Sequence, residues 1–353
     1  MVAQNHKPNF FDLTGEMLTD FLLNSGEPKF RKDQIWEGVY QHLWSNPDHF
    51  FNIPKKLRLS LSSSFDFDNL EPVKLLKSSD RKTEKMLFQT RGGAYIETVL
   101  MNYRERHTVC ISSQSGCPVG CLFCATGQMG FIANLTQGEI IEQVIFFARN
   151  LKDRSESLTN VVIMGMGEPF LNYENTLGAI QVLNDPLGFG MSARRFTIST
   201  VGIIPGIERF TKEKSQVNLA VSLHAPNDNL RDQLIPINKK YPIADLIVAC
   251  REYIQQTGRR ITFEYALIDG LNDSPVLARE LAVLLRGILC HVNLIQLNSS
   301  KNFLNQGSDL SRAKSFLNIL QKSGIPTTLR MRMGLDIKAG CGQLAFESSN
   351  DVP

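Results

Sequence analysis

The chain has 353 residues, a net charge of +3, and 42% hydrophobic and 21% charged residues, a composition typical of globular proteins that excludes disordered, collagen-like and coiled-coil chains. No apolar stretch approaches the ~18 residues of a membrane span, and the N-terminus lacks the apolar core of a signal peptide, so we expect a cytoplasmic protein with no membrane partner. The weak positive charge neither identifies nor excludes a nucleic acid as partner.

Two regions with different patterns precede the main part of the chain. Residues 12 to about 65 contain short helical patterns separated by polar residues, which predicts a small helical domain over residues 1–65. From Val73 to Met101, short apolar runs alternate with turn sequences, as they do in β-hairpins. Residues 66–102 are therefore predicted to link the helical domain to the rest of the chain.

From Thr108 onward, strand patterns rich in β-branched residues alternate with amphipathic helical patterns. The expected strands are HTVCIS, NVVIMGM, RRFTISTV, VNLAVSLH, RITFEYALI, HVNLIQLN and PTTLRMR. The expected helices cover residues 136–150, 172–184, from about 205, 243–257, 274–286 and 309–323. This alternation indicates parallel strands joined by helical crossovers. It predicts an α/β fold with about six such units, a closed or partial (β/α)6 barrel over residues 103–335, followed by a short tail over residues 336–353.

Three of the seven cysteines lie within eight residues, in the sequence Cys117-Pro-Val-Gly-Cys121-Leu-Phe-Cys124, just after the first strand of the barrel pattern. In a cytoplasmic chain, such a cluster favours metal binding or catalysis over disulfides. Three thiolates are one ligand short of a structural zinc site or of a fully protein-ligated [4Fe–4S] cluster. Three interpretations follow: a cluster with one open iron, a zinc site with a remote ligand, or buried structural cysteines.

The cysteine loop resembles the signature of radical S-adenosylmethionine (SAM) enzymes, in which the amino and carboxylate groups of SAM occupy the open iron. Phe123 stands where that family usually has an aromatic residue. Further motifs, in order along nearly the whole chain, resemble the RlmN/Cfr group of adenine methyltransferases: GEPKFRKDQIWEGVY, CISSQSGCPVGCLFCATGQMGF, MGMGEPFLN, ISTVG, AVSLHAPND, LIQLNSS and GLDIKAGCGQL. The resemblance implies a partial radical SAM barrel in which Cys117, Cys121 and Cys124 hold one [4Fe–4S] cluster.

Polar residues at predicted strand ends are candidates for binding SAM. In Gly165-Met-Gly167-Glu168, glycine lets a ligand approach the backbone, and the carboxylate can accept hydrogen bonds from an ammonium group. An ordinary turn is an equal alternative there, and helix capping is the alternative at the ends of the later strands. The resemblance assigns SAM binding to Gly167, Glu168, Ser199, Ser222, Leu223, His224 and Asn298.

Cys341 lies between two glycines that allow the tail to bend into the barrel mouth. The resemblance implies that one SAM methylates Cys341 and that a second SAM starts transfer of its methylene group to adenine, so that each turnover uses two SAM molecules. It also implies that Cys110 releases the product through a transient Cys110–Cys341 disulfide, reset by an external thiol reductant, and that Glu97 is the proton acceptor. Without the resemblance, Cys110 would be a core side chain and Glu97 a solvated carboxylate.

The resemblance implies methylation of carbon 2 of a specific adenosine in 23S ribosomal RNA, at the peptidyl transferase centre, and of one beside the anticodon of transfer RNA. The resemblance also implies that the helical domain, with Arg31 and Lys32, binds RNA and that an external donor supplies single electrons. The chain is expected to act as a monomer. Two alternatives are Cfr-type methylation of carbon 8 of the same ribosomal adenosine and an RNA-binding iron–sulfur redox sensor. One departure from the family is RMRMGLDI, where many relatives carry a short Arg-Gly or Arg-Ser-Arg-Gly arrangement.

Overall fold

The computed structural model describes residues 7–298 and 303–345. Three parts of the predicted elements lie outside the described residues. They are residues 1–6 of the helical domain, Ser299 and Ser300 of the LIQLNSS motif, and residues 346–353 of the tail.

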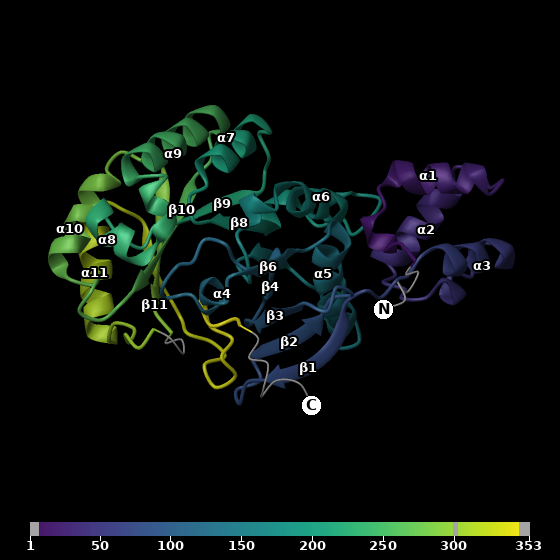
Figure 1. The fold of residues 1–353 in the computed structure, drawn as a ribbon, viewed down its shortest axis with the longest axis horizontal. Helices are drawn as coiled ribbons and strands as arrows, with labels where there is room; N and C mark the ends of the chain where they lie inside the picture. Colours follow the sequence, from purple (N-terminus) through teal and green to yellow (C-terminus); the bar gives the residue numbers. More distant parts are fainter. Residues whose placement is uncertain (1–6, 299–302, 346–353) are drawn as a thin grey trace.

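One large sheet organises the described part of the chain, with the strand order β1-β2-β3-β4-β7-β8-β9-β10-β11-β12 (Figure 1). The strands from β4 onward pair in parallel. They are β4 (His107–Ile111), β7 (Asn160–Ile163), β8 (Phe196–Thr200), β9 (Asn218–Ser222), β10 (Ile261–Leu267), β11 (Cys290–Gln296) and β12 (Thr327–Arg330). This sequential order confirms the predicted partial (β/α)6 barrel, to which β12 adds a further parallel strand.

Helices follow the parallel strands and cover the outer face of the sheet (Figure 1). They are α5 (Gln137–Lys152), α6 (Tyr173–Asn184), α7 (Ile204–Lys212), α9 (Ile243–Thr257), α10 (Pro275–Leu284) and α11 (Leu310–Lys322). All six were expected from their apolar periodicity, and α5 begins at a capping box formed by Thr136 and Glu139. The short helix α8 (Asp228–Leu234) was missed because seven residues carry too little periodicity. None of the helices in the described ranges is both long and apolar enough to cross a membrane.

The predicted hairpins form three antiparallel strands that extend the barrel sheet. They are β1 (Glu71–Lys77), β2 (Thr83–Gln89) and β3 (Tyr95–Asn102), and β3 pairs with β4. In the β2–β3 register, Leu87 lies opposite Glu97 and Lys85 opposite Val99. Because side chains alternate along a strand, these four residues share one face of the sheet. A small hairpin that the sequence did not predict, β5 (Gln114–Gly116) and β6 (Phe131–Asn134), flanks the cysteine loop, which contains the short helix α4 (Ala125–Gln128).

The N-terminal helices α1 (Gly15–Asn24), α2 (Arg31–Tyr40) and α3 (Lys55–Ser64) project from the side of the barrel, as Figure 1 shows, and form the predicted helical domain. The segments before α1 and after α3 are bound to Glu142 on α5, whose carboxylate accepts hydrogen bonds from Asn9 Nδ2 and the Asn69 backbone N–H, both at 2.7 Å. Burial raises the pKa of Glu142 to about 7. The buried, fully bonded carboxyl group fixes the helical domain to α5.

Candidate active site

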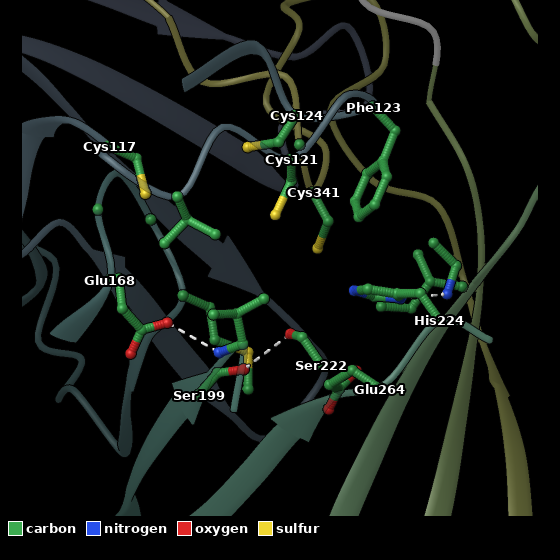
Figure 2. Close-up of a pocket in the computed structure, with 18 of the residues that line it drawn as sticks. Cys117, Cys121, Phe123, Cys124, Glu168, Ser199, Ser222, His224, Glu264 and Cys341 are labelled. Carbon is green, nitrogen blue, oxygen red and sulfur yellow. Dashed lines mark hydrogen bonds between the residues drawn. The ribbon is translucent and has the colours of Figure 1, made fainter. Parts of the chain in front are cut away.

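An open cavity lies at the carboxyl ends of the parallel strands (Figure 2). Its polar and sulfur-bearing lining residues are Cys117, Cys121, Cys124, Glu168, Ser199, Ser222, His224, Glu264, Arg330 and Cys341. A second cavity shares Cys124, Arg330 and Cys341 with the first and adds Cys110 and Asn298. The two cavities therefore meet at the tail, where Cys341 belongs to both.

The three cysteines of the loop point into the first cavity (Figure 2). The Cys117 N–H donates to Gly130 O at 2.9 Å and the Cys124 N–H donates to Cys121 O at 3.1 Å, so backbone hydrogen bonds fix the loop. Burial raises the pKa of Cys117 to about 12 and raises the pKa values of Cys121 and Cys124 as well. Each of these pKa values also rises from the charge of a neighbouring thiolate. Because all three thiols are buried close to other thiols, they lose their protons together only when bound cations neutralise the resulting charges.

The three thiols fit the cysteine ligands of a [4Fe–4S] cluster. Within residues 7–298 and 303–345, no three His, Cys, Asp or Glu side chains come together as they would around one metal ion. The thiols of Cys117, Cys121 and Cys124 instead border a shared cavity from separate positions (Figure 2). Three thiols on one cavity suit a four-iron cluster because each thiolate binds its own iron.

Glu168 lies in the cavity wall with both carboxylate oxygens already fixed. Oε1 accepts a hydrogen bond from the Phe170 N–H at 3.0 Å, and Oε2 accepts one from the Val201 N–H at 2.7 Å. Burial raises the pKa of Glu168 to about 7, against the opposing effect of these hydrogen bonds. The remaining lone pairs of this oriented carboxylate can accept hydrogen bonds from an ammonium or amine group in the cavity.

Gly167 allows Glu168 to reach this position. Its φ is +99°, in a region that side chains rarely adopt, and a Cβ would lie 2.6 Å from Gln114 Cβ. We predict that Gly167→Ala displaces the turn and weakens SAM binding by about 5- to 150-fold, as expected for about 1 to 3 kcal/mol of backbone strain. Equilibrium dialysis with SAM would measure this loss. Gly270→Ala is the control, because Gly270 also has a positive φ but no neighbour within 4 Å of a Cβ.

Three other predicted SAM contacts line the same cavity. Ser199 Oγ and Ser222 Oγ lie 3.4 Å apart at its floor. His224 Nδ1 accepts a hydrogen bond from the Ala266 N–H at 2.9 Å, so Nε2 carries the proton of the neutral ring and points into the cavity (Figure 2). Burial lowers the pKa of His224 to about 3, which keeps this ring an uncharged donor near neutral pH.

Leu223 and Asn298 are placed differently from the other predicted SAM contacts. The Leu223 side chain is buried, its N–H donates to Glu264 O at 3.0 Å, and it lines neither cavity. Asn298 lines the second cavity, and its buried Oδ1 has no hydrogen-bond partner in the described part of the chain. This oxygen is therefore available to accept a hydrogen bond from a ligand in that cavity.

The tail places Cys341 directly beside the cysteine loop. The Ala125 N–H donates to Gly342 O at 2.8 Å, and Thr126 Oγ1 donates to Leu344 O at 2.6 Å. Gly342 has a φ of +77°, which lets the chain turn immediately after Cys341. The two residues that follow Cys124 therefore hold the tail segment that carries Cys341.

Cys110, at the end of β4, shares the second cavity with Cys341. Burial raises the pKa of Cys110 to about 12, a charge on Cys341 raises it further, and the positive charge of Arg330 opposes both. Arg330 Nη1 lies 3.7 Å from Cys341 Sγ. The structure therefore brings the two candidate thiols and one guanidinium together at the junction of the cavities.

Glu97 is buried and is not the solvated carboxylate that its strand position would ordinarily suggest. It lines neither cavity. Its Oε1 lies 2.6 Å from Lys85 Nζ, and its Oε2 accepts a hydrogen bond from the Ala345 N–H at 2.9 Å. The tail thus covers this carboxylate in the conformation observed.

Sequence reasoning missed Arg330, Glu264 and Lys85. Arg330 is the last residue of β12 and the first of the RMRMGLDI segment, which differs from the family pattern. Ser199 and Ser222 were selected as polar residues at strand ends, and the same criterion would have selected Arg330. Glu264 accepts a hydrogen bond from Asn293 Nδ2 at 2.8 Å, and burial raises its pKa to about 7. Lys85 gives no local signal because a lysine within a strand is ordinarily solvated.

Comparisons with known proteins agree with this geometry. Residues 111–281 match the model of the radical SAM superfamily, and residues 8–66 match that of the ribosomal RNA large subunit methyltransferase N-terminal domain. The chain is 44% identical to the probable dual-specificity RNA methyltransferase RlmN of Chloroflexus aurantiacus, over 96% of this chain and 93% of that one, and 44% identical to that of Clostridium tetani, over 95% of each. A radical SAM methyltransferase from Sphaerobacter thermophilus superposes with a TM-score of 0.93 at 49% identity, covering 96% of this chain and 99% of that one.

Proposed function

Because the chain belongs to the RlmN family of radical SAM RNA methyltransferases, we propose that it methylates carbon 2 of one adenosine in 23S ribosomal RNA and of one adenosine beside the anticodon of certain transfer RNAs. The relatives' name, dual-specificity RNA methyltransferase, supports two RNA substrates. The observation that carries the chemistry is the shared cavity of Cys110 and Cys341, next to the cysteine loop. A redox sensor that catalyses no reaction would not require Cys110 and Cys341 to share a cavity.

The family uses a [4Fe–4S] cluster and SAM, which Cys117, Cys121 and Cys124 and the cavity wall would hold. When bound, the cluster supplies the electron that cleaves SAM. Glu168 and His224 offer an oriented acceptor and a neutral donor for the polar groups of SAM. Their backbone partners keep both groups in place before SAM arrives, so little reorganisation is needed on binding.

Cys341 then acts as the carrier of the methyl carbon. Its thiolate takes a methyl group from one SAM. The resulting thioether later gives one hydrogen atom to the deoxyadenosyl group that cleavage of a second SAM would release, and its methylene carbon bonds to carbon 2 of adenine. Carbon 2 then loses its hydrogen as a proton and gives up one electron, which the cluster would take back. Glu97 accepts the proton that carbon 2 loses. Because Cys341 borders both cavities, a small movement of the tail can turn its sulfur from SAM toward the adenine.

Cys110 completes the turnover. Its thiolate attacks Cys341 Sγ, the bond between that sulfur and the methylene carbon breaks, and the carbon keeps the electron pair and takes a proton to become the methyl product. A Cys110–Cys341 disulfide remains, and two electrons from an external thiol reductant restore both thiols. Arg330 supports this step because its charge favours the thiolate of Cys110.

Nucleoside analysis tests the proposal. Anaerobic turnover with protein-free 23S ribosomal RNA or transfer RNA, followed by mass spectrometry, is expected to yield 2-methyladenosine from both. If 8-methyladenosine appears instead, the enzyme has the Cfr-type activity. If neither RNA gains a methyl group while SAM is still cleaved, the substrate assignment is wrong.

We predict that the exposed Lys55 and Lys56 at the start of α3 contribute to RNA binding, together with Phe30 and Phe51, which are 55% and 78% exposed. Arg31 and Arg58 stack on these two rings at 4.9 and 5.6 Å, a mixture of charge and aromatic surface that suits unpaired RNA bases. The Lys55→Ala/Lys56→Ala variant should bind RNA more weakly, with a salt slope shallower by about 1.4 for two lost phosphate contacts. Filter binding at several salt concentrations measures both quantities.

The matched control is Lys314→Ala/Lys322→Ala on α11, which removes two exposed charges from the barrel. Equal losses in the two variants would indicate that net charge alone matters and would contradict a binding surface on the helical domain. The predicted contacts Arg31 and Lys32 are poorer test positions, because Arg31 also bonds to Gln34 and Asn52, and Lys32 pairs with Asp33.

A further inference from the structure

Lys85 and Glu97 form a buried ion pair beneath the tail. Lys85 comes from β2 and Glu97 from β3, on the same face of the antiparallel pair, with side chains 9% and 5% exposed. Their charged atoms lie 2.6 Å apart. A buried pair of this kind is costly to form, and it keeps a fixed geometry only where further hydrogen bonds satisfy both groups.

Those further hydrogen bonds come from the tail, on either side of Cys341. Lys85 Nζ donates to Lys338 O at 3.3 Å, three residues before Cys341, and Glu97 Oε2 accepts from the Ala345 N–H at 2.9 Å, four residues after it. One ion pair thus holds both ends of the loop that carries the thiol. Lys338 has a φ of +49°, unusual for a lysine, so this end of the loop keeps a conformation that needs support from its surroundings.

The same contacts cover the carboxylate of Glu97. With Lys85 on one carboxylate oxygen and Ala345 on the other, Glu97 lies under the tail and outside both cavities. Held in that position, the Glu97 carboxylate faces Lys85 and the tail and borders neither cavity. The tail segment that follows Cys341 must leave Glu97 before the carboxylate can act on RNA.

We propose that the Lys85–Glu97 pair is a latch for the loop Lys338–Ala345, and that Lys85 is a positioning residue for Cys341. In the RNA-free enzyme the latch holds Cys341 at the junction of the two cavities, where it can be methylated. Entry of the target adenine separates Ala345 from Glu97, so that the carboxylate becomes available as RNA arrives. The second half of this proposal rests on the proposed function of Glu97, whereas the first half concerns the RNA-free protein alone.

The test measures the tail directly, without RNA. In the anaerobically prepared holoenzyme, hydrogen exchange of residues 338–345 reports whether the loop is held, and intact-protein mass after incubation with SAM reports S-methylation of Cys341. Lys85→Met should make exchange in this segment at least about tenfold faster, because a charge-assisted hydrogen bond at each end depends on the pair. It should also slow methylation of Cys341. Lys85→Arg keeps the charge, so its hydrogen exchange in residues 338–345 and its rate of Cys341 methylation should stay close to those of the wild type.

Two further variants separate the latch from general destabilisation. Lys77→Met breaks another Lys–Glu contact, 3.4 Å from Glu84, but Lys77 is 52% exposed and Glu84 keeps Arg154, so the tail should be unaffected. Ala345→Pro removes the N–H that Glu97 accepts and leaves the buried ion pair intact. It should loosen the tail without lowering the melting temperature of the barrel.

Unchanged exchange in residues 338–345 in both Lys85→Met and Ala345→Pro would overturn the latch, whatever the activity on RNA. Faster exchange in these variants, combined with wild-type protein that methylates no RNA, would leave the latch standing and reject the proposed function. Addition of substrate RNA to wild-type enzyme should also speed exchange at Ala345. If RNA instead protects Ala345, the release step is wrong.

Discussion

Replacing Cys121 with alanine is expected to remove the [4Fe–4S] cluster and, with it, all cleavage of SAM. Loss of a residue that only supports a metal ligand costs about 10- to 100-fold in metal affinity, so loss of a ligand itself should cost more. Two remaining thiols cannot hold three irons. Iron and sulfide analysis, the visible absorption of the brown protein and the yield of methionine from SAM measure the effect. Cys117→Ala and Cys124→Ala should behave in the same way.

Cys250→Ala provides the control for loss of a thiol. Cys250 is fully buried on α9, lines neither cavity and has a pKa raised to about 12 by burial, so it behaves as a small apolar side chain. This variant should keep its iron and its SAM cleavage. Stoichiometric zinc without iron or sulfide in the anaerobic wild-type protein would exclude radical chemistry at the cysteine loop.

The barrel was predictable because its signals are local. Each strand such as Asn160–Ile163 is a short apolar run, and each helix such as α5 has a capping residue and an apolar face, so pattern alone locates them. The order of the strands follows from right-handed crossovers between neighbours. The β5–β6 hairpin escaped prediction because its strands are three and four residues long and enclose the cysteine loop.

The candidate site was only partly predictable, for a different physical reason. The residues of the first cavity could be located from the sequence, because Gly167 and polar residues such as Ser222 follow or end parallel strands, and these strands all end at one edge of the sheet. The burial of Glu97 was not predictable, since it depends on Lys85 from a neighbouring strand and on the backbone of Ala345, 248 residues away in the chain. Contacts between segments so far apart leave no trace in local pattern.

Cys110→Ala is expected to stop within its first turnover, as a covalent complex between Cys341 and the RNA. This variant keeps the cysteine loop and Cys341, so it can still methylate Cys341 and bond it to adenine. It lacks the thiolate that attacks Cys341 Sγ, and the adduct cannot be released. Denaturing gel electrophoresis with labelled RNA, followed by mass spectrometry of the linked peptide, detects the complex. Cys341→Ala should form neither adduct nor product.

The pH dependence of adduct release tests the same step in the wild-type enzyme. Burial raises the pKa of Cys110 to about 12, so the thiol form predominates near neutral pH and the reactive thiolate is scarce. Below that pKa the thiolate fraction grows about tenfold per pH unit, so release of the product should accelerate from about pH 7 to pH 9. Arg330→Met should slow release at every pH in this range, because the charge of Arg330 opposes the rise in the pKa of Cys110. Release that is independent of pH, or Cys110→Ala enzyme that turns over repeatedly, would show that another group frees the methyl product.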